Sequence, residues 1–509
     1  MNFELSELQK ESIKKMRGMS ACILALSPGC GKTITCLWHV KYDLLKDNND
    51  KCILFIPKSA RAAFKKELST KMEIPESEYI FVTAGKTFKY EDLSSRRYII
   101  VENSVANKYV EDLVALASTN ACHLVIDEAH SLQNPKSVFA SAAWEVRCYC
   151  KKIIAMTATP LLNDIEGLFN VLHFVYPRVF QSWFKFRARY CITQERVIRM
   201  KNRFGAVIQR KIIEITGFQN MEELNGILDK LIIKGCIHYN VNFNFLDCDL
   251  DKECEKLYAM AAKGFFDILY HPEKVKKKSK KKDDDLSNPA DDAKDFGARL
   301  HDLQRVVDFG STEPSQDIIS NKMKLMMQTV HDIMSRNESA LIYFEYTESL
   351  ELAEKILLQH KDSIGFKSIY KLTGAEKEDQ RAKIEANLDL KEIVLCSQAA
   401  SQSRNLQRAN NIVVMNCPFS VGRVVQLTGR VCRMDSTYKQ QNIYFISTSN
   451  TIDTYRTMLL KKRIGLIKLL LGDESTGALD NCECNYIDMD LSDINLLKKS
   501  NLWRRDQSH

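Results

Sequence analysis

The chain has 509 residues, of which 45% are hydrophobic and 27% charged, a composition typical of a soluble globular protein with about three domains. Its net charge of +8 is small for this length, so a nucleic-acid partner is allowed but not required. No apolar run approaches a membrane span, and Met1–Glu4 lacks a secretory pattern. We therefore expect an intracellular protein without a membrane partner.

The cysteine pattern argues against a structural metal. The 16 cysteines are scattered singly or in close pairs, and no two C-x₂-C units occur at zinc-ribbon spacing. Without a signal peptide, these thiols are expected to be reduced, in the cytosol or the nucleus.

A phosphate-binding loop is predicted near the start of the chain. Residues 1–20 form an apolar-periodic helix that contains Gln9, which in isolation would be an ordinary surface residue. A short buried strand, Ala21–Ala25, follows, and a glycine-rich turn then leads into a second helix. In this arrangement Lys32 reaches the β- and γ-phosphates and the Thr33 hydroxyl ligates Mg²⁺. The candidate ATP-binding residues of the turn are Leu26, which stands where the motif usually begins with glycine, and Ser27, Pro28, Gly29, Cys30, Gly31, Lys32 and Thr33.

A pair of carboxylates ends another predicted strand. Leu124–Ile126 is a short aliphatic run followed at once by Asp127 and Glu128. Asp127 is suited to hold Mg²⁺ through water, and Glu128 to orient or deprotonate the attacking water. Without other support, acidic residues after a strand would indicate only a solvated loop. The upstream phosphate loop favours the catalytic interpretation.

Strand-like runs recur at the spacing of an α/β domain, which predicts a parallel sheet covered on both faces. The last of them ends in Thr157 and Thr159, whose hydroxyls alone would indicate a helix cap. The predicted strands of the first half are Ala21–Ala25, Cys52–Ile56, Tyr79–Val82, Tyr98–Val101, Leu124–Ile126 and Ile153–Met156, and helices are predicted at Ala60–Leu68 and Val138–Val146.

The alternation fades between about residues 235 and 317. Lys274–Lys282 holds seven lysines in nine residues and is followed by three aspartates. Such a block is typical of a solvated, disordered loop, and it is also compatible with a nuclear-import signal or a phosphate-contacting tail.

A second α/β domain is predicted from about residue 322. Downstream, Arg430 and Arg433 lie three residues apart and would share one face of a helix. Paired with a phosphate site in another domain, they are candidate arginine fingers that stabilise the γ-phosphate when the domains close. The predicted strands are Leu341–Phe344, Ser368–Lys371, Ile393–Ser397, Ile412–Met415 and Asn442–Ile446.

In this order, the motifs resemble those of superfamily 2 helicase-like ATPases, specifically the Swi/Snf branch and its compact viral members. The matching segments are Leu5–Gln9, whose glutamine contacts adenine in that branch, Pro28–Thr33 (motif I), Phe55–Ser59 (Ia), Asp127–Asn134 (II), Thr157–Asp164 (III), Gly217–Leu228 and Gln426–Arg433 (VI). The resemblance covers about residues 1–470. Motif II contains the DEAH box Asp127, Glu128, Ala129 and His130, and the resemblance implies coupling roles for Thr157, Thr159 and Gln426.

The resemblance implies two RecA-like parallel-sheet lobes in tandem with a mostly helical interlobe insertion, an α/β fold. The expected parts are 1–235 (ATP-binding lobe), 236–317 (interlobe region), 318–470 (helicase lobe) and 471–509 (tail). It further implies an ATP- and Mg²⁺-dependent translocase or remodeller on duplex DNA that acts in viral or cellular transcription, with the transcription machinery as a candidate partner. The expected location is the nucleus, of the host if the protein is viral, or otherwise the cytoplasm.

Two alternatives stay open at this point. One is a helicase that separates DNA or RNA strands, and the other is a DNA-binding transcription regulator with weak ATPase activity. Two departures from the family pattern bear on them. Ala399–Leu406 lacks the glycines of motif V, and Ile232–Cys236 stands where an arginine pair is usual. Both imply weaker coupling between nucleic acid and ATP hydrolysis.

Overall fold

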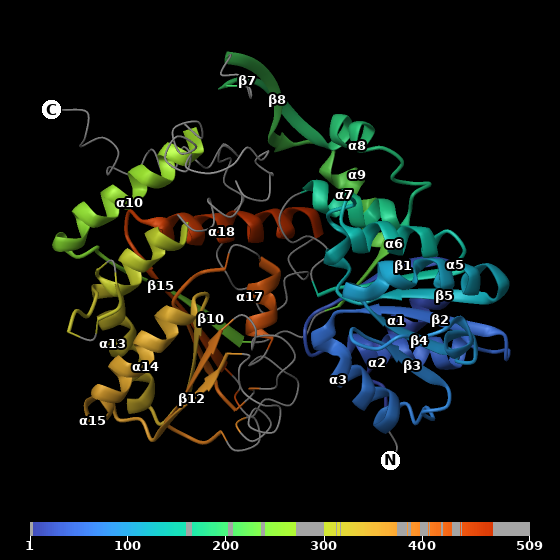
Figure 1. The fold of residues 1–509 in the computed structure, drawn as a ribbon, viewed down its shortest axis with the longest axis horizontal. Coiled ribbons are helices and arrows are strands. Elements are labelled where there is room, and N and C mark those ends of the chain that lie inside the picture. Colours follow the sequence, from blue (N-terminus) through green and yellow to red (C-terminus); the bar gives the residue numbers. More distant parts are fainter. Residues whose placement is uncertain are drawn as a thin grey trace.

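Two parallel β-sheets, one in each half of the chain, organise the fold, which is taken from a computed structural model (Figure 1). The seven-stranded sheet has the order β3-β4-β2-β5-β6-β1-β9, and the six-stranded sheet the order β10-β15-β14-β11-β13-β12. The predicted two-lobed α/β fold is therefore confirmed. The structure describes residues 4–158, 165–201, 207–235, 240–270, 300–311, 313–315, 317–373, 384, 388–397, 406, 408–418, 421–429, 438 and 440–471.

The first lobe alternates strands and helices, as the sequence predicts, up to β6. Its elements are α1 Glu7–Arg17, β1 Ala21–Leu26, α2 Lys32–His39, β2 Asp50–Ile56, α3 Arg61–Lys66, β3 Tyr79–Val82, α4 Tyr90–Ser94, β4 Tyr98–Glu102, α5 Val110–Thr119, β5 Ala121–Ile126, α6 Val138–Arg147, β6 Lys152–Met156, α7 Ile165–Val175, α8 Trp183–Tyr190, β7 Cys191–Lys201, β8 Val207–Phe218, α9 Met221–Leu231 and β9 Ile232–Gly235.

The strands of the first sheet are buried on both faces because helices cover each side. Within β1, Ile23 joins the core formed with α5, α6 and α7, whereas Cys22 and Leu24 join the core formed with α1, α2 and α3. This period of two explains why the strands appear in the sequence as continuous apolar runs.

The second lobe follows with the same parallel pattern. Its elements are β10 Asn240–Cys248, α10 Lys252–Tyr270, α13 Asn321–Ser335, β11 Ala340–Phe344, α14 Thr347–Gln359, α15 Lys361–Ile364, β12 Ser368–Leu372, β13 Glu392–Ser397, β14 Asn411–Val414, α17 Val421–Thr428, β15 Gln440–Thr448 and α18 Ile452–Leu471, with a further helical stretch at 300–309.

The first segment of the predicted interlobe region is a strand, not a helix. β10 pairs in parallel with β15 from Asn240↔Gln440 to Cys248↔Thr448, and thereby forms an edge of the second sheet. Phe243 and Phe245 both stack on Phe445, with ring centroids 6.4 and 5.1 Å apart. The alternation of apolar residues with asparagines in Asn240–Cys248 is the pattern of a half-buried edge strand. The helical part of the region is α10 and 300–309.

Residues 274–282, which contain the lysine block, lie outside the described residues, as does the tail beyond 471. The domain boundaries therefore stay a prediction, with the addition that β10 belongs to the second sheet. Among the helices that the structure describes, none combines the length and the apolar character that crossing a bilayer requires.

The two lobes are in direct contact through helices. α18 extends from the second lobe to the first, where it packs against α9 (Figure 1). One continuous hydrophobic cluster includes Leu224 and Leu228 of α9 and Leu460 and Ile464 of α18. The lobes therefore share part of one core.

A buried ionic network fixes the start of α18. Lys322 of α13 is fully enclosed and pairs with Asp308 at 2.8 Å and with Asp453 at 2.7 Å. Gln304 donates to both carboxylates, at 3.0 and 2.9 Å, and Ser349 of α14 donates to Asp308 at 2.7 Å. The network joins helical residues 300–309 to α13, α14 and α18.

We predict that Lys322→Ala lowers the free energy of unfolding of the second lobe by about 3–5 kcal/mol, because two buried carboxylates lose their counter-charge. Urea denaturation followed by circular dichroism measures the change. The control is Lys324→Ala on the same helix, where the side chain is 60% exposed and the expected change is within about 0.5 kcal/mol. Equal stability of the two variants would contradict the stabilising role of Lys322 in the buried network.

Candidate active site

Three neighbouring strands bring the predicted catalytic segments of the first lobe to one edge of its sheet. β5, β6 and β1 are adjacent and parallel, so their carboxyl ends meet. Asp127 follows β5, Thr157 follows β6 and the phosphate loop follows β1. Segments about 130 residues apart in the sequence are thereby placed together.

The phosphate loop is a tight turn between β1 and α2. Gly29 and Gly31 adopt positive φ angles of 84° and 74°, which favour glycine. The Cys30 amide donates to the Ser27 carbonyl at 3.2 Å and closes the turn. Lys32 and Thr33 form the first turn of α2, where free backbone amides and the helix dipole attract anions. The Lys32 ammonium donates to the carbonyl of Leu26 at 2.9 Å, across the mouth of the loop.

Gln9 contacts this loop directly and is not a surface residue. Its side-chain amide donates to the carbonyl of Cys30 at 3.3 Å, and its amide oxygen accepts from the Ser6 backbone at 2.9 Å in a capping box. A β-carbon added to Gly31 would lie 2.3 Å from the Gln9 amide nitrogen. Gln9 therefore packs against the phosphate loop, where it is predicted to contact the nucleotide.

The strand β9 supports the loop from the other side. The Ser27 amide donates to the carbonyl of Gly235 at 2.9 Å. A β-carbon at Gly235 would lie 2.6 Å from Leu8 and 2.8 Å from Leu26. This contact was not predicted from the sequence, although a glycine in a short strand is a known signal of close backbone approach.

The carboxylate pair lies at a strained position beside the loop. The Asp127 amide donates to the Phe55 carbonyl at 2.8 Å, which holds its side chain in the interior. Burial, together with the charge of Glu128, raises the pKa of Asp127 to about 7, whereas Lys32 opposes this shift. Glu128 has a φ of 51°, a left-handed conformation that is uncommon for a side-chain-bearing residue, and its carboxylate lies 3.1 Å from the Nδ1 atom of His130.

These carboxylates fit a divalent cation. A buried acid whose pKa is raised by its surroundings is short of positive charge, and a bound cation supplies it. Thr33 and Asp127, the predicted Mg²⁺ residues, come from neighbouring parts of the same sheet edge. Within the described residues, no group of three or more His, Cys, Asp or Glu side chains is arranged to hold a metal ion, at this edge or elsewhere.

Thr157 is fully buried, and its amide donates to the Leu24 carbonyl at 3.1 Å, so it sits between β6 and β1. The other predicted coupling residue of this segment, Thr159, lies outside the described residues.

The second lobe contacts the phosphate loop through the segment that resembles motif VI. Gln426 is half-buried on α17, and Gly429 follows the helix. A β-carbon at Gly429 would lie 2.4 Å from the β-carbon of Pro28, so the backbone of Gly429 packs closely against the proline ring. Arg430 and Arg433 lie outside the described residues, next in sequence to this contact.

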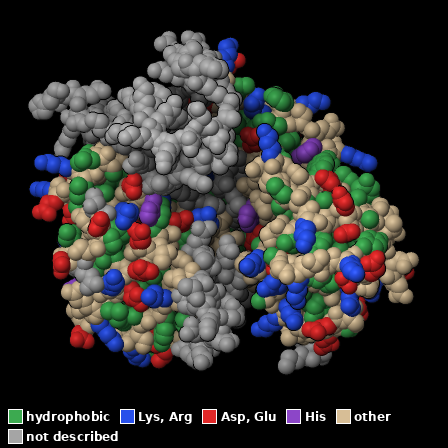
Figure 2. Space-filling model, in the orientation of Figure 1, with side chains coloured by type: hydrophobic (Ala, Val, Ile, Leu, Met, Phe, Trp, Pro, Cys, Tyr) green, Lys and Arg blue, Asp and Glu red, His purple; other side chains and the backbone are tan. Residues whose placement is uncertain are grey.

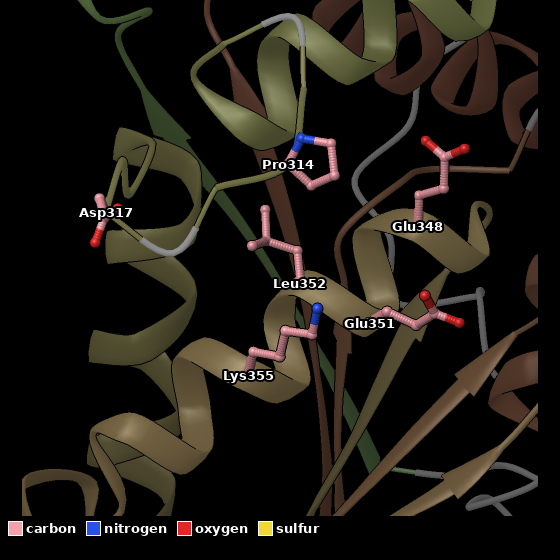
Figure 3. A pocket seen from close by; sticks show the side chains of 6 residues that line it. All are labelled: Pro314, Asp317, Glu348, Glu351, Leu352 and Lys355. Carbon is pink, nitrogen blue, oxygen red and sulfur yellow. The ribbon is translucent and has the colours of Figure 1, made fainter.

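A surface pocket of about 360 Å³ lies elsewhere, on the second lobe beside α14 (Figure 3). Its lining contains none of the predicted site residues, so it is not the predicted nucleotide site. The lining residues are Pro314, Asp317, Glu348, Glu351, Leu352 and Lys355.

Comparison with protein families agrees with the two-lobed geometry. Residues 9–290 match the SNF2-related domain, and residues 321–435 match the helicase conserved C-terminal domain. The chain belongs to the SNF2 family. It is accordingly a helicase-like ATP hydrolase that acts on nucleic acid, which confirms the predicted family and enzyme class.

Individual relatives of this SNF2-family chain are distant. It is 23% identical to the uncharacterized ATP-dependent helicase YqhH of Bacillus subtilis, over 96% of this chain and 82% of that protein. It is 20% identical to the mouse DNA annealing helicase and endonuclease ZRANB3 and 22% identical to the yeast DNA repair and recombination protein RAD54. The matches cover 90% and 88% of this chain but only 40% and 53% of those two proteins.

Among solved structures, the SWI2/SNF2 ATPase core of Sulfolobus solfataricus in complex with dsDNA is similar, with 18% identity and a TM-score of 0.40. The match covers 98% of this chain and 97% of that chain.

We predict that Gly31→Ala weakens ATP binding by about tenfold, since a β-carbon at this left-handed position costs roughly 1–2 kcal/mol and also displaces Gln9. Titration with a fluorescent ATP analogue measures the change. Gly85→Ala is the matched control, because its φ is also positive, at 83°, yet no atom lies within 4 Å of the added carbon. Unchanged affinity in the Gly31 variant, or an equal loss in both, would contradict the contact.

Proposed function

We propose that this SNF2-family chain is an ATP-dependent translocase on duplex DNA that remodels protein–DNA complexes. The packing of Gly429 on Pro28 carries the proposal, because it places the second lobe against the phosphate loop of the first. An ATP site shared between two lobes is suited to converting nucleotide turnover into relative movement of the lobes.

The geometry of the first lobe supports the chemistry that we assign to its residues. Backbone amides of Gly29–Thr33 and the Lys32 ammonium bind the phosphates, and Gln9 borders the loop. Thr33 and, through water, Asp127 would hold Mg²⁺, which neutralises developing phosphate charge. Glu128 orients or deprotonates the attacking water. Thr157, Thr159 and Gln426 connect this site to nucleic-acid contact.

Duplex DNA is the proposed substrate for two reasons. Relatives that match most of this chain are a DNA annealing helicase and a DNA repair and recombination protein. The resemblance of the motifs to the Swi/Snf branch also favours translocation over strand separation. A role in transcription, viral or cellular, rests on the same resemblance. A nuclear location is supported by the lysine block at 274–282.

A second candidate is a DNA-binding regulator with weak ATPase activity. The observation that favours it is the absence of the motif V glycines in Ala399–Leu406.

We expect the ATPase rate to rise with duplex DNA, by less than roughly 100-fold because of the altered motif V, and to vanish in Lys32→Ala, which removes the charge on the β- and γ-phosphates. The measurement compares no nucleic acid, single-stranded DNA, duplex DNA and RNA. Preferential stimulation by single strands or RNA would instead support a strand-separating helicase. A slow ATPase rate that does not change with any of the nucleic acids would support the DNA-binding regulator.

We expect Arg433→Ala to lower kcat by about 10³-fold while changing ATP affinity much less, because an arginine finger acts mainly in the transition state. Arg430→Ala is tested in parallel as the competing candidate, with Arg→Lys at each position to separate charge from geometry. The control is Arg336→Ala, an arginine of the second lobe that is 44% exposed and pairs with Glu338. Full activity in both the Arg430 and Arg433 variants would refute the shared site.

A further inference from the structure

A two-stranded antiparallel ribbon, β7–β8, stands apart from both sheets. It pairs from Cys191↔Phe218 to Lys201↔Val207 and is joined by no third strand in the described part of the chain. In Figure 1 it projects beyond α8, away from the seven-stranded sheet. At about 3.3 Å per residue, its 11-residue first strand extends roughly 35 Å.

Hydrogen bonds and hydrophobic packing attach the base of the ribbon to the first lobe. Arg189, just before β7, makes two hydrogen bonds of 2.8 and 2.7 Å to Glu223 of α9, and Tyr190 donates to the same carboxylate at 2.8 Å. Phe218 packs against the main hydrophobic core. α9 in turn packs on α18 of the second lobe. The ribbon is therefore anchored at its base, close to where the two lobes meet.

The outer part of the ribbon has no such packing. Val197 is 51% exposed and Ile213 is 47% exposed, although they lie well inside the paired region. An isolated two-stranded ribbon is only marginally stable in water, and exposed large apolar side chains add to its cost. These properties are typical of a surface that is covered when a partner binds.

The charge of this segment identifies the class of partner. The described residues of α8, β7 and β8 contain eight lysines and arginines against two glutamates, a surplus of six. The entire chain has a surplus of only eight, from 73 basic and 65 acidic residues. On the face seen in Figure 2, basic and acidic side chains are mixed over both lobes. α8 and the ribbon thus form one concentration of positive charge, in addition to the lysine block at 274–282.

Basic residues occur in both strands of the ribbon. The register places Val197 opposite Lys211, so these two exposed side chains lie on one face. The major groove of duplex DNA admits a two-stranded ribbon and is bordered by phosphates on both sides.

We propose that the β7–β8 ribbon is a contact for duplex DNA separate from the cleft between the lobes, with its basic residues bound to the phosphate backbone. The proposal rests on the proposed function, since it requires that duplex DNA is the substrate. Because the base of the ribbon is attached to α9, the DNA contact of the ribbon is linked to the packing of α9 on α18.

The test measures the affinity of the full chain for a 30-base-pair duplex by fluorescence anisotropy as a function of salt. The ribbon variant is Arg199→Gln/Lys201→Gln/Lys211→Gln, and the matched control Lys324→Gln/Lys361→Gln/Lys367→Gln removes three exposed lysines of the second lobe, from α13, α15 and the residue before β12. Each phosphate contact contributes about 0.9 to the slope of log K against log salt. The ribbon variant should lower this slope by about 2–3 and weaken binding at least tenfold, and the control should match wild type.

An unchanged slope in the ribbon variant, with wild-type binding intact, would overturn the ribbon contact but leave the proposed function standing. Wild-type protein that binds no duplex would refute the proposed function and the ribbon contact together. Polyglutamate that competes as strongly as duplex DNA in wild type, and not in the ribbon variant, would show an acidic protein as the partner instead. If thermal unfolding shows that the triple variant is misfolded, Arg199→Gln alone should lower the slope by about 0.9.

Discussion

The parallel order β5-β6-β1 is the constraint on which the ATP site depends. Each strand is followed by only one functional element: the phosphate loop follows β1, the carboxylate pair follows β5 and Thr157 follows β6. Parallel pairing places all three at the same end of the sheet, and the helices on both faces bury the strands so that the edge cannot shift. The main-chain bonds from Asp127 to Phe55, from Thr157 to Leu24 and from Ser27 to Gly235 extend the strand pairing to the functional residues themselves.

The second lobe reaches this edge through two kinds of contact with different physical character. The α9–α18 contact is apolar and lies within a continuous core, so separating it exposes hydrophobic surface. The contact of Gly429 with Pro28 is a close approach of two small residues, which depends on the absence of a side chain. The first contact holds the lobes together, and the second fixes how closely the motif VI segment approaches the phosphate loop.

The sequence was sufficient to predict the two sheets, because fully buried parallel strands appear as short apolar runs at regular spacing. It also located the phosphate loop and the carboxylate pair, whose residue types are dictated by their chemistry. What it did not show were features that depend on tertiary neighbours. The residue pattern alone would make Gln9 a surface residue, because its partner, the Cys30 carbonyl, lies 21 positions away, and only the family resemblance assigned it to the nucleotide. The β7–β8 ribbon was missed because its sequence has no regular alternation of apolar and polar residues. β10 was missed, although its apolar residues alternate with asparagines, because the segment was assigned to the interlobe region.

The succession of β9 and β10 has a mechanical consequence. Gly235 ends an edge strand of the first sheet and Asn240 begins an edge strand of the second, so five Cα–Cα steps, about 18 Å when fully extended, form the only covalent tether between the sheets at this point. This length limits how far the end of β9 and the start of β10 can separate. Because the Gly235 carbonyl accepts a hydrogen bond from the Ser27 amide, a displacement of the end of β9 would be transmitted to the phosphate loop. The end of β9, where the connection to the second sheet begins, and the phosphate loop are thus separated by a single hydrogen bond.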